Sequence, residues 1–264
     1  MKMKYILILC LFITSKSIAQ NYSLNNKEFE CVYAVVYNNP IDVGTSYSQV
    51  VGKLYITNSN SLFYCIPTND KKQIKNNESE SDPNLFEIKI DTMFKVIKHS
   101  NINKLNFKDN LFSKKGKYFA DTLHPMKWEL IDSSRKIDNL QCFKAKTYYK
   151  GRDYIAWYCP EIAISNGPWK LGGLPGLIIE TYDSKEQIHF LLKSIKSDKM
   201  IEYAKKIIKQ SEIFETQTYG EYIKSGKKFI ENLRAQINGQ TSDNCLTCQN
   251  ESNITLHTLE IVFD

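Results

Sequence analysis

The stretch Trp169-Lys-Leu-Gly-Gly-Leu-Pro-Gly-Leu-Ile-Ile-Glu180 sets a turn motif between two apolar runs. The motif itself is Gly173, Leu174, Pro175 and Gly176. Proline presets φ at the second position of a turn, and glycine accepts the positive φ that a type II turn requires at its third. We therefore expect a tight turn here that leads directly into a strand.

Two strand-like runs, at 141–149 and 152–159, precede this stretch and flank Lys150-Gly151. If the loop has only these two residues, counting outward from it places Cys142 directly opposite Cys159. The cysteines then fall on a non-hydrogen-bonded pair, where side chains are closest, and a disulfide is feasible. A longer loop would shift the register and break the pairing. The hairpin thus predicts a disulfide between Cys142 and Cys159.

The same register divides this aromatic-rich hairpin into two faces. One is expected to face the core: Phe143, Ala145, Thr147, Tyr154, Ala156 and Tyr158. The other exposes Trp157 between Lys144 and Lys146, as a surface cation–π stack, which we favour, or as the wall of a binding groove. The candidate ligand-binding residues are Arg152, Tyr154, Trp157, Trp169 and Lys170.

The N-terminus has the order of a secretory signal peptide: basic residues, an apolar run and small residues before Ala19. We expect cleavage after Ala19, a signal peptide at 1–19 and a single β-rich domain at 20–264. Lipidation at Cys10 is disfavoured, because Leu9 stands where a small residue is needed. Removal of the three leader lysines lowers the formal charge from +6 to about +3. Such a balance argues against nucleic-acid binding, and no later stretch predicts a membrane span.

Six cysteines remain after cleavage, and an even number in an exported chain favours disulfides. For Cys245-x-x-Cys248, a loop disulfide is favoured over a redox pair or half of a zinc site, because the motif follows a helix and only His257 is near. That disulfide lies within the pair or reaches out to Cys31 and Cys65. The disulfide candidates are Cys142, Cys159, Cys31, Cys65, Cys245 and Cys248.

Most of the chain has the period-two pattern of short strands. A polar surface loop is expected at 68–83, a turn at 133–139, helices at 198–210 and about 218–237, and a closing strand at 254–263. Thr218-Tyr-Gly-Glu221 fits a capping box that begins the second helix. Fold class is therefore mainly β: a single curved antiparallel sheet, half-barrel or barrel-like, with one or two helices packed near the C-terminus. The further strands are expected at 29–37, 48–57, 61–67, 85–97, 101–112, 117–123, 128–131, 177–182 and 187–195.

No catalytic or metal-binding motif emerges, and no catalytic residue, metal or cofactor is predicted. The histidines are scattered singly, and His189 is interpreted as structural. Carboxylates are frequent around the central motifs, and a spatial pair of them could do acid–base work. The histidines are His99, His124, His189 and His257, and the carboxylates are Asp121, Glu129, Asp153, Glu161, Glu180 and Asp183.

The central region resembles the GLPGLI family of secreted bacterial proteins, which has no established activity. Five motifs of that family follow in order: Trp128-x-Leu130, the Cys142–Thr147 run, the Gly151–Tyr158 run, Glu161-Ile162 with Gly167-Pro168, and Gly173–Ile178. Cys159 departs from the family pattern, which is consistent with a disulfide peculiar to this chain. The resemblance implies export to the periplasm or cell surface of double-membraned bacteria, and it carries over no catalytic residue.

We expect an exported, non-enzymatic binding or envelope-assembly protein with an apolar or peptide-like ligand between sheet and helix. Its expected partner is that ligand or an outer-membrane or envelope protein. A sheet half-closed around a helix would be similar to the bacterial lipoprotein carriers, by analogy alone. The alternatives are a secreted hydrolase with a carboxylate pair and a purely structural extracellular module.

Overall fold

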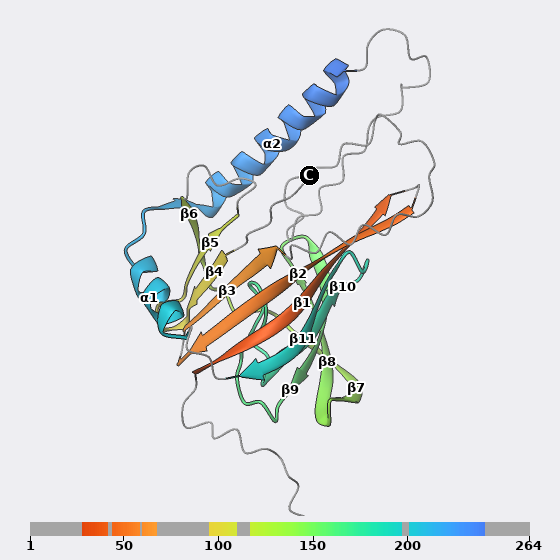
Figure 1. Ribbon diagram of the computed structural model, residues 1–264, viewed down its shortest axis with the longest axis vertical. Coiled ribbons are helices and arrows are strands. Elements are labelled where there is room, and N and C mark those ends of the chain that lie inside the picture. The colour runs from red at the N-terminus through yellow and green to blue at the C-terminus, as the bar shows by residue number, and fades with distance from the viewer. Residues whose placement is uncertain are drawn as a thin grey trace, which may run out of the picture.

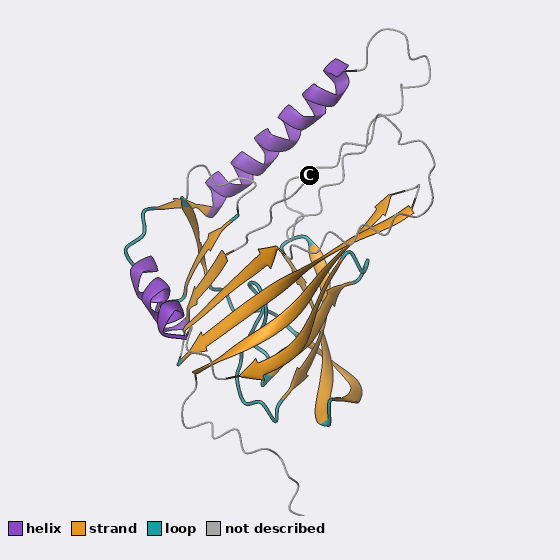
Figure 2. Cartoon of the chain, in the orientation of Figure 1, coloured by secondary structure: helices purple, strands orange, loops and turns teal. Residues whose placement is uncertain are grey.

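The computed structural model describes residues 28–41, 44–58, 60–67, 95–109, 117–196 and 201–240. These residues form one large sheet with two α-helices near the C-terminal end (Figures 1 and 2). The mainly β fold with two late helices, predicted from the sequence, is confirmed. The helices are α1 (Ile201–Ser211) and α2 (Tyr219–Gln240), and the strands are β1 (Glu28–Ile41), β2 (Gly44–Thr57), β3 (Asn60–Pro67), β4 (Lys95–His99), β5 (Lys104–Lys108), β6 (Tyr118–Thr122), β7 (Glu129–Ile137), β8 (Leu140–Tyr149), β9 (Arg152–Cys159), β10 (Leu177–Asp183), β11 (Ile188–Lys196) and β12 (Thr216–Thr218).

The sheet is a single curved surface with the order β12-β6-β5-β4-β3-β2-β1-β11-β10-β9-β8-β7. Every neighbouring pair is antiparallel except β12 with β6. Strand β1 joins the two halves, because it pairs with β2 on one side and with β11 on the other. Strands β12 and β7 end the order, so the described sheet is open.

The two faces of the sheet carry different apolar clusters. Consecutive residues in a strand point to opposite sides, and Leu54 and Tyr55 accordingly belong to separate clusters. We call the side of Leu54 the inner face and the side of Tyr55 the outer face. Helix α1 covers part of the outer face. Its apolar residues recur at helical spacing and therefore lie on one side of the helix, and that side packs against the sheet. This outer cluster contains Tyr55, Leu62, Ile97, Ile201, Ala204 and Ile208.

Helix α2 begins on the inner face. The predicted capping box is present: the Thr218 amide donates to Glu221 Oε2 at 2.6 Å, and the Glu221 amide donates to Thr218 Oγ1 at 3.2 Å. The first turn then places Tyr222 edge-on against Phe107 of β5 and Phe119 of β6. Beyond these turns the helix runs away from the strands (Figure 1).

The hairpin of β8 and β9 has the predicted register. Tyr149 pairs with Arg152 across a turn in which Lys150 and Gly151 both have positive φ, 50° and 85°. That geometry is typical of a two-residue hairpin loop. The disulfide between Cys142 and Cys159 is present, with a Cα–Cα distance of 4.4 Å. The prediction made from the register is therefore confirmed.

Removing this disulfide is expected to destabilise the fold. We predict that the double substitution of Cys142→Ala and Cys159→Ala lowers the free energy of unfolding by about 2 to 3 kcal/mol, because the bridge restricts the unfolded chain. Denaturant titration measures the loss. The control is Cys65→Ala, which removes a buried but unbridged sulfur and should cost about 1 kcal/mol. Equal losses in the two proteins would contradict a stabilising bridge.

The type II turn expected at the Gly-Leu-Pro-Gly motif is wrong. Gly176 has a φ of 155°, and its amide donates to the Leu174 carbonyl at 2.8 Å. The next amide, of Leu177, donates to the distant Ile162 carbonyl at 3.0 Å. The motif therefore guides the chain against Ile162 and into β10, and tertiary contact overrides the local turn preference.

Other predictions also need correction. Most of the turn expected at 133–139 belongs to β7, which has an irregularity between Ile131 and Ser134, and only Asp138 and Asn139 make the turn. Cys31 and Cys65, predicted as disulfide candidates, are free. They lie on β1 and β3 with β2 between them, so two strand spacings of roughly 9 to 10 Å separate them, and the register adds an offset of two residues along the strands. No disulfide spans that distance. Several predicted features lie outside the described residues: 1–19, 68–83, Cys245, Cys248 and 254–263.

Candidate functional site

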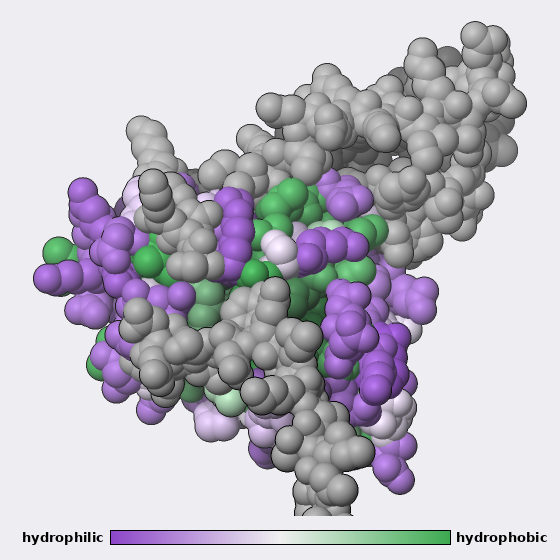
Figure 3. All heavy atoms as spheres, turned by 60° about the horizontal axis from the view of Figure 1, so that its bottom comes forward, coloured by the Kyte–Doolittle hydropathy of each residue, from purple (hydrophilic) through white to green (hydrophobic). Residues whose placement is uncertain are grey.

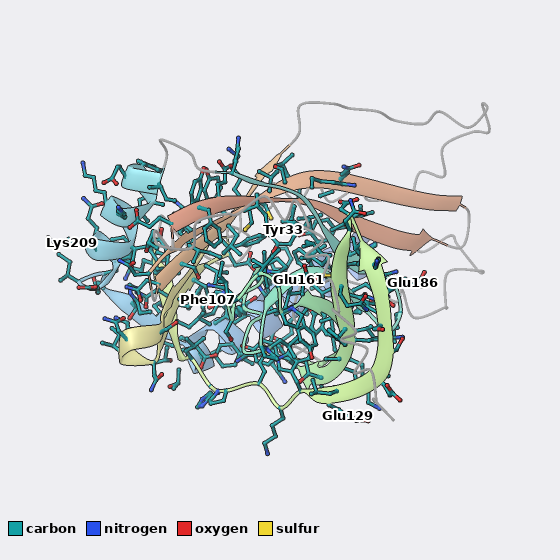
Figure 4. The ribbon with its side chains drawn as sticks, turned by 90° about the horizontal axis from the view of Figure 1, so that it is seen from below. Tyr33, Phe107, Glu129, Glu161, Glu186 and Lys209 are labelled. Carbon is teal, nitrogen blue, oxygen red and sulfur yellow. A yellow bond between two sulfur atoms is a disulfide. The ribbon has the colours of Figure 1, made fainter. Side chains whose placement is uncertain are left out.

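Residues 160–176, here called the inner segment, connect β9 to β10 and lie against the inner face. Trp169, Leu171 and Leu174 are buried in the main core cluster. Seen from below, the space enclosed by the curved sheet is filled with side chains, among them Tyr33 and Phe107 (Figure 4). The chain therefore uses one of its own segments to cover the inner face.

The motif residues hold the inner segment in place. Trp128 donates its indole N–H to the Gly172 carbonyl at 2.8 Å, and Glu161 accepts the Gln141 amide at 2.7 Å. Gly167 packs so closely on Ile178 that a Cβ would lie 2.8 Å from that side chain. Tyr33 of β1 donates to the Ile178 carbonyl at 2.7 Å. The motifs that carry the family resemblance thus contact one another and serve the architecture of this region.

A buried lysine of β4 is the strongest anchor of the inner segment. Lys98 donates to Asn166 Oδ1 at 2.5 Å, to the Gly167 carbonyl at 2.9 Å and to the Leu171 carbonyl at 2.8 Å. Three acceptors match the three N–H groups of an ammonium. Burial nevertheless lowers the pKa of Lys98 to about 7, because desolvation penalises the charged form more than these contacts favour it.

A second lysine, Lys170 of the inner segment, is enclosed by aromatic rings. Its Nζ lies 3.5 Å from the ring centroid of Phe107, and the side chain is buried. The rings of Trp169, Tyr219 and Tyr222 also lie around this Nζ atom. We call this arrangement, with its nearby polar groups, the aromatic chamber. It brings β5, the inner segment and the start of α2 together around the Lys170 ammonium. A second cation, Lys150 Nζ, lies 3.3 Å from the centroid of the Tyr219 ring.

Polar groups line one side of the aromatic chamber. Asp109 is buried and accepts the Tyr222 hydroxyl at 3.1 Å. Tyr37 of β1 is also buried, and its hydroxyl has no hydrogen-bond partner among the described residues. Burial, with further contributions from Cys65, Asp109 and Tyr154, raises the pKa of Tyr37 well above its ordinary value. The chamber therefore combines ring faces with a carboxylate, and the Tyr37 hydroxyl lies close enough to that carboxylate for the two to interact electrostatically.

Trp157 lies on the outer side of the hairpin but is buried, which corrects the prediction of an exposed indole. The Arg135 guanidinium of β7 covers it at 4.1 Å from the ring centroid, and Lys144 lies at 5.7 Å. The expected cation–π stack is thus present, with Arg135 as its main cation because β7 folds over the indole. Arg135 also pairs with Glu180, whose other oxygen contacts His189 at 3.0 Å.

Arg152 has a local role at the turn between β10 and β11. It forms a buried ion pair with Asp183 at 2.9 Å and donates to Gln187 at 2.7 Å. The other oxygen of Asp183 accepts the Ile188 amide at 2.8 Å. This network fixes the return of the chain into β11.

Of the five predicted ligand-binding residues, the structure brings three together. Tyr154 and Trp169 are in ring contact at 6.0 Å, and Lys170 lies beside Trp169. Trp157 and Arg152 belong to the separate contacts described above. The expected core face of the hairpin is buried except for Phe143, which is 38% exposed. Sequence reasoning missed the following residues of the site: Tyr37, Lys98, Phe107, Asp109, Tyr219 and Tyr222.

The described residues contain no group of three or more His, Cys, Asp or Glu side chains placed to hold a metal ion. No helix in the described part of the chain is both long and apolar enough to cross a bilayer.

Figure 3 shows apolar side chains gathered in the middle of the face that it presents, among polar ones. A separate depression of about 250 Å³ lies between α1 and the turn from β2 to β3 and is lined mainly by polar residues.

Comparison with known proteins gives a short family match. A family described as "Protein of unknown function (Porph_ging)" matches residues 147–180, from the end of β8 into β10. A search of the curated proteins finds no match. The matched residues contain the hairpin turn, the second disulfide cysteine and the whole inner segment.

Among solved structures, the chain is similar to PNGF-II in its P21 crystal form, with 16% identity, a TM-score of 0.48, and coverage of 78% of this chain and 34% of that one. The similarity to the C2 crystal form has 16% identity, a TM-score of 0.44, and coverage of 77% of this chain and 33% of that one. A LolA superfamily protein from Nitrosomonas europaea gives 8% identity, a TM-score of 0.29, and coverage of 65% and 86%. The chain thus spans about a third of the length of PNGF-II.

Proposed function

We propose that the protein is an exported, non-enzymatic binding or accessory protein of the bacterial envelope. Its ligand, apolar or peptide-like, is accommodated between the inner face of the sheet and the first turns of α2. The location is the periplasm or the cell surface. The match to a family of unknown function over residues 147–180 is compatible with this role, and membership of the GLPGLI family is part of the same proposal.

One observation carries the proposal: the inner face meets α2 through apolar and aromatic side chains that stay partly accessible. Ile223 and Phe229 of α2 pack against the main core cluster and are only half-buried. Trp128, Ile162 and Ile164 border the same cluster in the same way. Protein sites for small ligands are lined mainly by such side chains, with a few polar groups for orientation.

The disulfide and the buried acids also fit a binding protein. A bridge between Cys142 and Cys159 suits an oxidising compartment. The buried carboxylates Glu30, Asp109 and Asp183 each contact a partner: Lys53, Tyr222 and Arg152, respectively. Carboxylates engaged in this way are less suited to a hydrolytic pair, so the structure gives no specific support to the hydrolase alternative.

The direct test is to purify the mature protein from its exporting host and to identify bound molecules. Native mass spectrometry, followed by extraction, should show a lipid-like or peptide-like molecule in stoichiometric amount. Protein stripped of that molecule should take up an apolar fluorescent probe. An empty protein that binds neither the probe nor an extract of its own envelope would overturn the proposal and favour a purely structural module.

A substitution on α2 tests the position of the site. We predict that Ile223→Glu weakens binding of the apolar probe at least tenfold, because a carboxylate placed in an apolar site must be desolvated. Fluorescence titration measures the change. Lys224→Glu is the matched control, since it adds the same carboxylate at the exposed neighbouring position and should leave binding within about twofold. Equal losses in both proteins would show that the probe binds elsewhere.

A further inference from the structure

The aromatic chamber has the composition of a site for an organic cation. Besides the close contact with Phe107, the Nζ of Lys170 lies 5.5 Å from the Tyr219 centroid, 5.6 Å from that of Trp169 and 5.7 Å from that of Tyr222. Ring faces attract a nearby ammonium, and cages of several rings are a common means of binding ammonium ligands. Three separate parts of the chain supply these rings, so the cage exists only in the folded protein.

A carboxylate beside the chamber suits the same kind of ligand. The buried Asp109 carboxylate provides a compensating negative charge near the cage. It accepts the hydroxyl of Tyr222, one of the cage rings, at 3.1 Å. The cage thus offers an ammonium both ring faces and a nearby negative charge.

We propose that the aromatic chamber binds the primary alkylammonium of a lysine side chain in an exported peptide, and that Lys170 occupies this site while the ligand is absent. The inference rests on the proposed function and specifies its ligand. The present occupant is itself a lysine, placed between Trp169 and Leu171, which shows that a peptidyl lysine fits the cage. A quaternary or bulkier cation has no such precedent here.

Exchange of one lysine for another requires little movement of the backbone. Lys98 holds Asn166, Gly167 and Leu171, on both sides of Lys170, so the inner segment stays anchored. The lysine stem is flexible and can swing out alone.

Two substitutions separate an internal ligand from a structural lysine. Lys170→Ala vacates the cage, whereas Lys170→Met keeps an unbranched side chain in it. We expect the peptide acetyl-Leu-Lys-Leu-amide and n-butylammonium to bind Lys170→Ala at least tenfold more tightly than the unmodified protein, as measured by calorimetry. Lys170→Met should show no gain, and a peptide with norleucine in place of lysine should not bind. If neither probe binds Lys170→Ala that retains its near-ultraviolet circular dichroism, the inference is overturned.

The unmodified protein provides a second measurement if Lys170→Ala fails to fold. The ε-methylene signal of Lys170, observed by NMR with labelled lysine, should be shifted by the surrounding rings and should move to its ordinary position when the peptide is added. An unmoved signal at saturating peptide overturns the proposal. Vesicles containing phosphatidylethanolamine form a parallel arm, and a shift with vesicles but not with peptide overturns the peptide assignment. Uptake of the apolar probe without displacement of Lys170 leaves the proposed function standing and removes only this inference.

Discussion

Gly176→Ala is expected to destabilise the protein by about 3 kcal/mol or more, because the added methyl group would overlap the backbone. A Cβ at this position would overlap the Cys159 carbonyl oxygen and lie 2.6 Å from the Cys159 carbonyl carbon and 2.8 Å from the Pro160 nitrogen. These atoms cannot retreat, since Cys159 is paired with Leu177 and bridged to Cys142. Denaturant unfolding, followed by tryptophan fluorescence, measures the loss.

Gly172→Ala is the matched control for Gly176→Ala. The two glycines lie in the same inner segment, but a Cβ at Gly172 would have its nearest neighbours at 3.7 Å, an ordinary contact. We expect the free energy of unfolding to change by no more than about 0.5 kcal/mol. A slight increase is expected if alanine reduces the conformational entropy of the unfolded chain. Similar losses at both positions would mean that the segment tolerates no added side chain and that the close approach of Gly176 has no special weight.

The fold was predictable wherever the pattern is local. Alternation in β1 gives the buried series Cys31, Tyr33, Val35 and Tyr37, as period two requires. The capping box at Thr218 correctly placed the start of α2, and the two-residue loop fixed the register that brings the bridged cysteines together. Each of these predictions depends on contacts within a few residues or between adjacent strands.

The prediction failed where distant contacts decide the conformation. Leu174-Pro175-Gly176 has the composition of a type II turn, yet Gly176 is needed for its close approach to the backbone of Cys159. Ser134 belongs to the turn expected from the sequence, but it pairs with Phe143 of β8 and so lies in the edge strand β7. Trp157 was expected to be exposed, yet Arg135 of β7 reaches across β8 and covers it.

In the candidate site, too, residues close together in the sequence were predicted and residues distant in the sequence were not. Tyr154, Trp169 and Lys170 were identified because they belong to one motif-rich region of the sequence. Phe107 and Asp109 lie some sixty residues away, and only the sheet order brings them to Lys170. Lys98 could have been suspected from a lysine inside the apolar strand Lys95–His99, but its acceptors could not. Pairing of Tyr219 with Tyr222 at helical spacing was a usable signal for an aromatic face.

Several of these contacts fix the position of the inner segment, which lies within the matched region. The disulfide, Trp128 and Gly176 all determine where the inner segment lies. The segment in turn delivers Trp169 and Lys170 to the aromatic chamber. In a binding protein, such a segment would control access to the inner face, and its stability would set how readily a ligand enters.

Lys98→Met is expected to loosen the inner segment. We expect the loss of stability relative to the unmodified protein to grow as the pH rises. The substitution keeps an unbranched side chain but leaves Asn166 Oδ1 and two carbonyl oxygens without their donor. Unsatisfied buried acceptors cost about 1 to 3 kcal/mol each before water reaches them, while removal of a buried ammonium offsets part of the loss. We expect the free energy of unfolding to fall by about 1 kcal/mol at pH 6 and about 4 kcal/mol at pH 9.5.

The direction of this pH dependence follows from the lowered pKa of Lys98. The folded pKa is about 7 and the ordinary value is 10.5, so between these values the unfolded state holds the proton more often. The contribution of Lys98 to stability therefore rises with pH across that interval, by about 1.4 kcal/mol for each unit of difference in pKa. Below pH 7 Lys98 is charged in both states and its contribution to the slope vanishes. Methionine does not titrate, so the difference between the two proteins isolates this contribution.

Lys95→Met on the same strand is the control for this experiment. Lys95 is half-buried and lies opposite Lys108 of β5, and burial together with that neighbouring charge lowers its pKa. Because its removal relieves repulsion and frees no described acceptor, we expect a neutral or slightly stabilising effect, within about 1 kcal/mol. Urea titrations at pH 6 and pH 9.5 compare the three proteins. A Lys98→Met protein whose deficit stays constant between the two pH values would show that Lys98 is not a buried, readily deprotonated anchor.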